Sequence, residues 1–265
     1  MLGRDRSHPS PILRRAARRA LVAWLGVSLA GATPFVAQAQ TSSVAMLPAA
    51  QDVSDLPLVA VRATGHTGTL AVFLSGDGGW ADIDKQIGEV LAERGIDVVG
   101  FDDKAYLRGK QRNAQGTASD VTRAAAHYLQ AWNDHRLVLV GYSRGADLLP
   151  FVANRVPPSL RSRLALVAML GMQERASFTY RFSDLWATHS RASDLPIRPE
   201  LERLRGLNMA CVYGRDESES LCRGVDSTLV QPMARPGKHH FDGDYRAIAA
   251  WLVTRLDAGL ARNPR

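Results

Sequence analysis

The sequence feature that most constrains the fold is a glycine-flanked serine between a strand pattern and a helix pattern. Residues 137–140 are Leu-Val-Leu-Val, an apolar run typical of a strand that is buried on both faces of a sheet. The motif Gly141-Tyr142-Ser143-Arg144-Gly145 follows directly, and residues 145–156 have helical spacing. A GxSxG motif in this context is typical of a sharp turn that lifts a serine hydroxyl above the carboxyl end of a parallel sheet. The context therefore favours Ser143 as a nucleophile over a plain first turn of a helix.

Strand and helix patterns alternate along the chain. Strands are expected at residues 56–63, 70–74, 97–101, 137–140, 164–170, 209–213 and 228–233, and helices at 83–91, 119–132, 145–156 and 245–256. This alternation predicts an α/β protein with a mostly parallel central sheet and helices on both faces. Residues 172–206 fit the alternation least, and we interpret them as an insertion over the site.

The first 39 residues have the pattern of an export signal. Arginines at positions 14, 15, 18 and 19 precede an apolar segment at residues 21–32, and Ala37-Gln38-Ala39 matches the small-x-small pattern of a signal peptidase site. The general secretory route fits better than the twin-arginine route, and a retained membrane anchor is the alternative. We therefore expect a signal peptide at residues 1–39, a flexible linker at 40–55, one domain at 56–265 and a periplasmic location.

The net charge of +7 does not point to nucleic acid. Residues 1–39 contain six arginines and one acidic residue, Asp5, so this segment carries +5 of the total. The rest of the chain, with 27 basic and 25 acidic residues, has no strong net field. A polyanionic partner is therefore not expected.

Two cysteines, Cys211 and Cys222, lie in the part of the chain that would be exported. Neither belongs to a CxxC motif or has a histidine at metal-ligand spacing, so a disulfide is favoured over a metal site in an oxidising compartment. Two separate buried thiols are the alternative.

A nucleophilic serine needs a base and an acid that orients the base. In this architecture the chain order is serine, acid, histidine. Asp216 and Glu217 follow the expected strand at 209–213, and the sequence leaves both open as the acid. His239 is preferred over His240 as the base, and His240 would then be a structural or substrate-contacting residue.

The residues around Ser143 suggest further roles. An oxyanion hole is expected from the backbone amides of Arg144 and of Asp77, which lies in the glycine-rich loop at residues 75–79. That loop lacks the Lys-Ser/Thr ending of a phosphate-binding loop. Asp147 could brace the turn, contact a cationic substrate, or be a helix-surface acid.

Four spaced motifs together resemble the bacterial virulence protein VirJ/AcvB family, over about residues 68–256. They are the loop Ser75-Gly76-Asp77-Gly78-Gly79-Trp80, the segment from Gly141 to Asp147 with Pro150, the Cys211–Cys222 segment with Tyr213-Gly214, and Gly237 to Tyr245 with its two histidines. The resemblance implies a periplasmic α/β hydrolase that removes lysine or alanine from aminoacyl-phosphatidylglycerol. For some members it also implies a link to type IV secretion and virulence. Arg144, where the family commonly has an aromatic residue, and Tyr106-Leu107-Arg108, in place of an aromatic-rich stretch, put substrate preference in doubt.

The expected activity is therefore ester hydrolysis through an acyl-enzyme on Ser143, with no metal and no organic cofactor required. The expected partner is an aminoacylated phospholipid at the membrane surface, with secretion-system components as further candidates. The alternatives are a non-catalytic periplasmic binding or secretion-accessory protein, and a general esterase or thioesterase.

Overall fold

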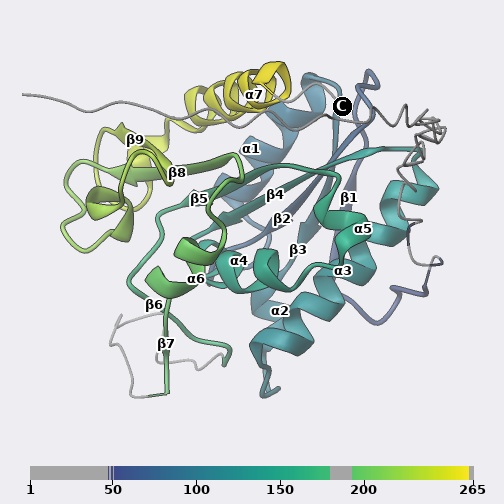
Figure 1. Cartoon of the computed structure of the whole chain (residues 1–265), viewed down its shortest axis with the longest axis horizontal. Coiled ribbons are helices and arrows are strands. Elements are labelled where there is room, and N and C mark those ends of the chain that lie inside the picture. The colour runs from purple at the N-terminus through teal and green to yellow at the C-terminus, as the bar shows by residue number, and fades with distance from the viewer. Residues whose placement is uncertain (1–46, 48, 50, 180–192, 263–265) are drawn as a thin grey trace, which may run out of the picture. The chain divides into compact units, whose positions relative to one another are not determined.

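A seven-stranded sheet forms the centre of the fold (Figure 1). Its strand order is β1-β3-β2-β4-β5-β8-β9, with bounds Leu58–Val61 (β1), Thr69–Leu74 (β2), Ile96–Phe101 (β3), Arg136–Tyr142 (β4), Leu164–Leu170 (β5), Met209–Gly214 (β8) and Gln231–Arg235 (β9). The edge strand β1 is antiparallel to β3, and the other pairs in this sheet are parallel. The predicted α/β class with a mostly parallel sheet is therefore confirmed.

The computed structural model describes residues 47, 49, 51–179 and 193–262. All of these residues belong to one compact unit, residues 43–265. The expected signal peptide lies outside the described residues. Among the described residues, no helix has both the length and the apolar character needed to cross a membrane.

Helices cover both faces of the sheet (Figure 1). The longer helices are α1 (Asp82–Glu93), α3 (Ala114–Ala131), α4 (Arg144–Arg155) and α7 (Tyr245–Arg262), and the shorter ones are α2 (Asp103–Leu107), α5 (Pro158–Arg161) and α6 (Arg198–Arg203). Two single-turn 3-10 helices are η2 (Leu221–Gly224) and η3 (Phe241–Gly243).

Strand β2 shows how the two layers of helices hold the sheet. Successive side chains of a strand point to opposite faces. Leu70, Val72 and Leu74 therefore pack in the cluster that contains residues of α3 and α4. Ala71 and Phe73 pack in the cluster that contains residues of α1 and α7. Because both faces are covered, the central strands are apolar without alternation.

Several element boundaries differ from the sequence prediction, and two of them have clear local reasons. Helix α3 begins at Ala114 rather than at residue 119, because the Asn113 side chain accepts a hydrogen bond from Gly116 N at 2.8 Å and caps the first turn. Strand β9 begins at Gln231 rather than at residue 228. Asp226 Oδ1 accepts a hydrogen bond from Thr228 N at 2.8 Å, which favours a turn there.

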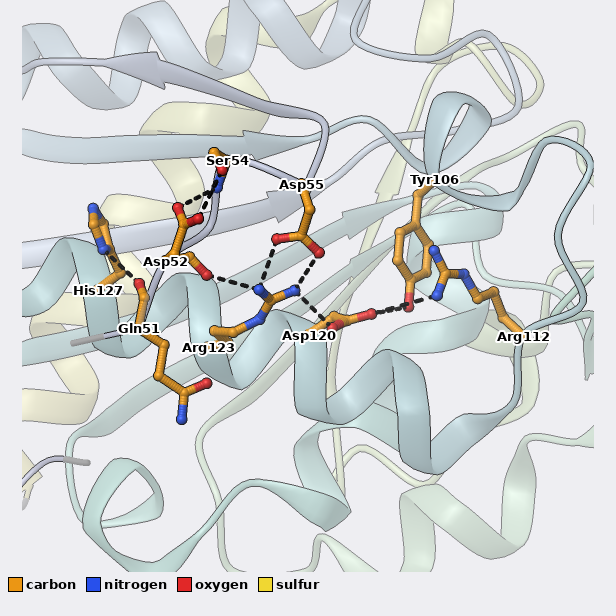
Figure 2. Close-up of polar contacts among 9 residues, drawn as sticks. All are labelled: Gln51, Asp52, Ser54, Asp55, Tyr106, Arg112, Asp120, Arg123 and His127. Atoms are coloured by element: carbon orange, nitrogen blue, oxygen red, sulfur yellow. Dashed lines mark hydrogen bonds and ion pairs between the residues drawn. The ribbon is translucent and has the colours of Figure 1, made fainter. Parts of the chain in front are cut away.

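Residues 51–55 of the expected linker are not a flexible tether. Arg123 of α3 donates hydrogen bonds to Asp52 O at 2.7 Å and to both carboxylate oxygens of Asp55, at 2.7 and 2.8 Å (Figure 2). Val53 is buried in the core. These residues therefore belong to the packed domain, because an arginine fork fixes them to α3.

The expected insertion at residues 172–206 is described at residues 172–179 and 193–206. It contains α6 and a small two-stranded sheet, β6 (Arg175–Ala176) paired with β7 (Leu195–Pro196). Ser177 O and Thr179 O accept hydrogen bonds from Arg144 Nη1 at 3.2 and 3.1 Å. The segment therefore reaches the residue that follows Ser143.

Candidate active site

Ser143 occupies a strained turn between β4 and α4. Its φ of 52° and ψ of −118° lie in a backbone region that residues other than glycine rarely adopt, at a cost of about 1 to 3 kcal/mol. A side chain at Gly141 would collide with Gly145 O, and one at Gly145 would collide with Leu74 O. The two glycines of the motif are therefore required by close backbone approach, and the predicted sharp turn is present.

Ser143, His239 and Glu217 form a continuous line of hydrogen bonds. Ser143 Oγ lies 2.8 Å from His239 Nε2, and His239 Nδ1 lies 2.6 Å from Glu217 Oε1. Gly171, with φ of +68°, makes room for the imidazole, because a Cβ at this position would lie 2.8 Å from His239 Cε1. Such a line can transfer a proton from the hydroxyl to the imidazole and stabilise the imidazolium that forms.

Of the two acids that the sequence leaves open, Glu217 contacts the imidazole. Its side chain is 9% exposed, and it also accepts hydrogen bonds from Gln173 Nε2 at 3.2 Å and from Gly214 N at 3.4 Å. Asp216 is exposed, and its backbone N donates to Gly237 O at 3.0 Å. The turn therefore directs position 217 inward and leaves position 216 at the surface.

The two adjacent histidines lie in different environments. His240 is exposed, and its Nδ1 lies 3.2 Å from the hydroxyl of Tyr142. The ring of Tyr142 also packs against His239, with ring centroids 5.3 Å apart. Burial raises the pKa of Tyr142 above its usual range, so this side chain stays a neutral phenol. His240 thus contacts a residue that supports the His239 ring.

The glycine-rich loop after β2 lies beside the serine. A Cβ at Gly76 would lie 3.2 Å from Ser143 Cβ, and Gly145 N donates to Ser75 O at 3.1 Å. The N-terminus of α4 begins at Arg144, so the helix dipole favours negative charge close to Ser143. The roles of the Arg144 and Asp77 amides in an oxyanion hole remain predictions that this placement supports.

The sequence did not indicate that the side chains of Arg144 and Asp77 pair with each other. Arg144 Nε donates to Asp77 Oδ1, and the two side chains are 8% and 29% exposed. Because Arg144 also donates to the carbonyls of residues 177 and 179, it connects the loop after β2 to the described part of the insertion. The sequence signal for this pair was a charged residue, Arg144, inside the GxSxG motif, together with an acid in the loop expected to lie beside that motif.

Asp147 is buried rather than a surface acid, which excludes the third of its predicted roles. It is 8% exposed, and its Oδ1 accepts a hydrogen bond from Gln173 N at 2.7 Å. Burial raises the pKa of this carboxyl well above its usual range, although the Gln173 amide opposes the shift. Asp147 therefore braces the segment after β5, and its predicted contact with substrate stays a prediction.

Two further buried acids, Asp84 and Asp103, lie near this end of the sheet, and the sequence analysis did not identify them. Burial raises the pKa of Asp84 to about 7 and that of Asp103 well above its usual range. Asp103 N donates to Ser75 Oγ at 3.0 Å, which places Asp103 against the loop after β2. The adjacent acids after β3, at positions 102 and 103, were the sequence signal.

The disulfide between Cys211 and Cys222 is present, which confirms that prediction. Its Cα atoms are 5.7 Å apart, and it joins β8 to η2. Glu217 lies inside the loop that the disulfide closes. The cross-link therefore restricts the segment that presents the acid to His239.

The sheet order, the sharp turn at Ser143 and the Ser-His-carboxylate line define an α/β-hydrolase fold. A lipase in its open form has this fold, with a TM-score of 0.55 at 14% identity over 76% of this chain and 94% of that one. A protein of unknown function from Agrobacterium tumefaciens, described as a putative α/β hydrolase, has a TM-score of 0.54 at 17% identity over 78% and 92%. A thioesterase domain from the curacin biosynthetic pathway has a TM-score of 0.51 at 14% identity over 74% and 94%.

Residues 68–260 match the family described as bacterial virulence protein (VirJ), and the chain therefore belongs to that family. This result confirms the resemblance found in the sequence motifs. No curated protein is significantly similar to the chain. The solved structures are too distant in sequence to show more than a common fold.

Proposed function

We propose that this protein is an exported serine hydrolase that cleaves the aminoacyl ester of lysyl- or alanyl-phosphatidylglycerol. The observation that carries the proposal is the hydrogen-bonded line Ser143–His239–Glu217 at the carboxyl end of the sheet, in a member of the VirJ family. The disulfide is compatible with an oxidising compartment such as the periplasm. Substrate, location and a link to secretion systems follow from the family resemblance.

The proposed reaction begins when Ser143 Oγ attacks the ester carbonyl while His239 Nε2 accepts the hydroxyl proton. Negative charge develops on the carbonyl oxygen, where the amides of Arg144 and Asp77 and the N-terminus of α4 would stabilise it. His239 then donates its proton to the glycerol oxygen of the leaving phosphatidylglycerol. Glu217 keeps the imidazole oriented and stabilises its charged form throughout.

The second half of the reaction returns the enzyme to its starting state. Water attacks the aminoacyl ester on Ser143, and His239 accepts a proton from that water. The tetrahedral intermediate collapses, the proton returns to Ser143 Oγ, and the free amino acid leaves. These steps use the chain's own groups and consume one water for each ester bond.

The acidic residues near Ser143 support a substrate whose acyl group carries a positive charge. An aminoacyl ester carries an ammonium group next to the reacting carbonyl, and carboxylates attract it. Asp77, which is 29% exposed, is more accessible than the buried Asp147. Asp77 is therefore the better candidate to contact this ammonium group, in competition with Arg144.

A general esterase or thioesterase is the second candidate, because a lipase and a thioesterase domain share the fold. A non-catalytic binding protein on the same scaffold is the alternative from another class. Covalent labelling by a fluorophosphonate probe, lost in Ser143→Ala, separates catalysis from mere binding. Comparing membrane lipids with and without the protein tests the substrate, since aminoacylated phosphatidylglycerol should accumulate in its absence.

A further inference from the structure

A cluster of side chains with potential metal-ligating atoms lies at the end of the sheet opposite Ser143. His66 belongs to the loop before β2, Asp97 is the second residue of β3, and Asp134 lies in the loop before β4. His66 Nδ1 is 3.7 Å from Asp97 Oδ2 and 3.7 Å from Asp134 Oδ1. All three atoms lie within 4.8 Å of one another. Three segments that are distant in sequence thus bring one nitrogen and two oxygen donors together.

The two carboxylates are buried with incomplete hydrogen bonding. The Asp134 side chain is 0% exposed, and neither of its oxygens has a hydrogen-bond partner among the described residues. The Asp97 side chain is 1% exposed, and its Oδ1 accepts a hydrogen bond from Ala63 N at 2.8 Å. This bond leaves Asp97 Oδ2 as the oxygen nearest His66. A buried carboxylate is unfavourable unless a cation, hydrogen-bond donors or a proton compensates its charge, and a cation bound between the two carboxylates would compensate both.

Neighbouring side chains supply only part of that charge. Arg62 Nη1 lies 3.3 Å from Asp97 Oδ2, but the Arg62 side chain is 51% exposed and its guanidinium packs over the Trp132 ring. Among the described residues, the basic side chain that contacts Asp134 is His66, and the distance of 3.7 Å is too long for a hydrogen bond. Asp134 therefore lacks a strong partner.

We propose that His66, Asp97 and Asp134 bind one divalent transition-metal ion, with Zn²⁺ as the best match. An imidazole ligand favours zinc over magnesium or calcium, which prefer oxygen ligands alone. Tetrahedral zinc with bonds of 2.0 to 2.2 Å places its ligand atoms about 3.3 Å apart. The two separations of 3.7 Å from His66 Nδ1, and the third within 4.8 Å, need a contraction of at most about 1.5 Å to match this geometry. His66 is 46% exposed, which gives the ion access from solvent and leaves room for a water as fourth ligand.

The backbone near the ligands is already fixed by hydrogen bonds. Thr67 donates from its N and Oγ1 to Gly95 O, at 3.0 and 2.8 Å, which holds the loop that carries His66. Asp134 N donates to Leu129 O at 2.9 Å. A bound ion would cross-link the β1–β2 loop to the amino ends of β3 and β4. Its role is therefore structural, and the site does not depend on the hydrolase proposal.

Calorimetric titration of the untagged, EDTA-treated protein with ZnCl₂ tests the site. One ion per chain is expected. His66→Gln and Asp134→Asn should each weaken the affinity at least about tenfold, because each removes one of three protein ligands. Zinc at about 100 times its dissociation constant should raise Tm by about 5 to 10 °C, and both variants should lose this rise.

Two control variants separate the site from nonspecific zinc binding. His127→Gln changes a histidine outside the cluster, and Asp257→Asn changes an exposed acid on α7. Both should bind zinc like the parent protein. The Asp134→Asn variant removes a buried charge, so it should still fold, and far-ultraviolet circular dichroism checks this. Absence of one-to-one binding, or equal binding by the ligand and control variants, would overturn the proposal.

Discussion

The two ends of the central sheet combine histidine and buried carboxylates in different geometries. At the carboxyl end, the His239 imidazole lies between Glu217 and Ser143, with hydrogen bonds of 2.6 and 2.8 Å. At the amino end, Asp97 and Asp134 converge on His66 at 3.7 Å without hydrogen bonds to it. The first is a line of donors and acceptors that suits proton transfer. The second is a triangle of one nitrogen and two oxygen atoms that suits a bound cation. The two clusters therefore differ in geometry rather than in residue type.

The largest expected effect is the loss of hydrolysis when the serine at the carboxyl end of the sheet is replaced. Ser143→Ala removes the attacking oxygen, so hydrolysis should fall about 10⁴-fold or more, measured with a p-nitrophenyl ester or with lysyl-phosphatidylglycerol. Ser119→Ala, an exposed serine on α3, is the matched control and should keep full activity. Retention of activity by Ser143→Ala would assign the reaction to another group.

The next largest effect is expected when Glu217, the acid that contacts His239, is replaced. Glu217→Gln leaves the imidazole without a negative partner, so kcat should fall about 10³-fold. Asp216→Asn changes the exposed neighbour and should leave kcat within about twofold. Steady-state kinetics with the same ester measure both variants. Equal losses in the two variants would show that Glu217 has no special position.

The sequence predicted the sheet, the turn at Ser143 and the pairing of a late histidine with it, because each has a local signature. The apolar strand at 137–140, the two glycines and the helical spacing that follows specify one turn geometry. The choice between Asp216 and Glu217 could not be made in this way. It depends on which side of the turn after β8 faces His239, and that is decided by tertiary contacts such as the bond from Gln173 Nε2 to Glu217.

The amino-end cluster was not predicted for a related reason. His66, Asp97 and Asp134 are separated by more than thirty residues each, so no sequence spacing connects them. Only the parallel register brings the start of β2 beside the starts of β3 and β4. The residues 51–55 were likewise assigned to a linker because their contact with Arg123 of α3 is long-range.

The buried acid Asp84, near the carboxyl end of the sheet, should make the free energy of unfolding depend on pH. An aspartate in the unfolded chain has a pKa of about 3.9, and burial raises the pKa of Asp84 to about 7. The contribution of Asp84 is therefore most favourable below pH 4 and is lost as pH rises toward 7, by up to about 4 kcal/mol. Asp84→Asn should match the parent at pH 4 and be more stable at pH 8.

Urea unfolding at the two pH values measures this difference. Asp82→Asn, an exposed neighbour on α1, is the control and should change the free energy of unfolding by less than about 0.5 kcal/mol at both. A pH-independent difference between Asp84→Asn and the parent would contradict the assignment of a buried, protonated acid near the reaction site.

The smallest expected effect comes from removing the disulfide, and it tests whether the sites at the two ends of the sheet are independent. The Cys211–Cys222 disulfide closes a short loop that contains Glu217, so the double variant Cys211→Ala/Cys222→Ala should lose about 3 kcal/mol of unfolding free energy. Its kcat should also fall, because the acid is held less firmly against His239. Zinc binding at the amino end should be unchanged, since the disulfide joins β8 to η2 and touches none of the three ligands. Urea unfolding, ester kinetics and zinc titration of this one variant therefore test whether the two ends act independently, and a parallel loss of zinc affinity would contradict that independence.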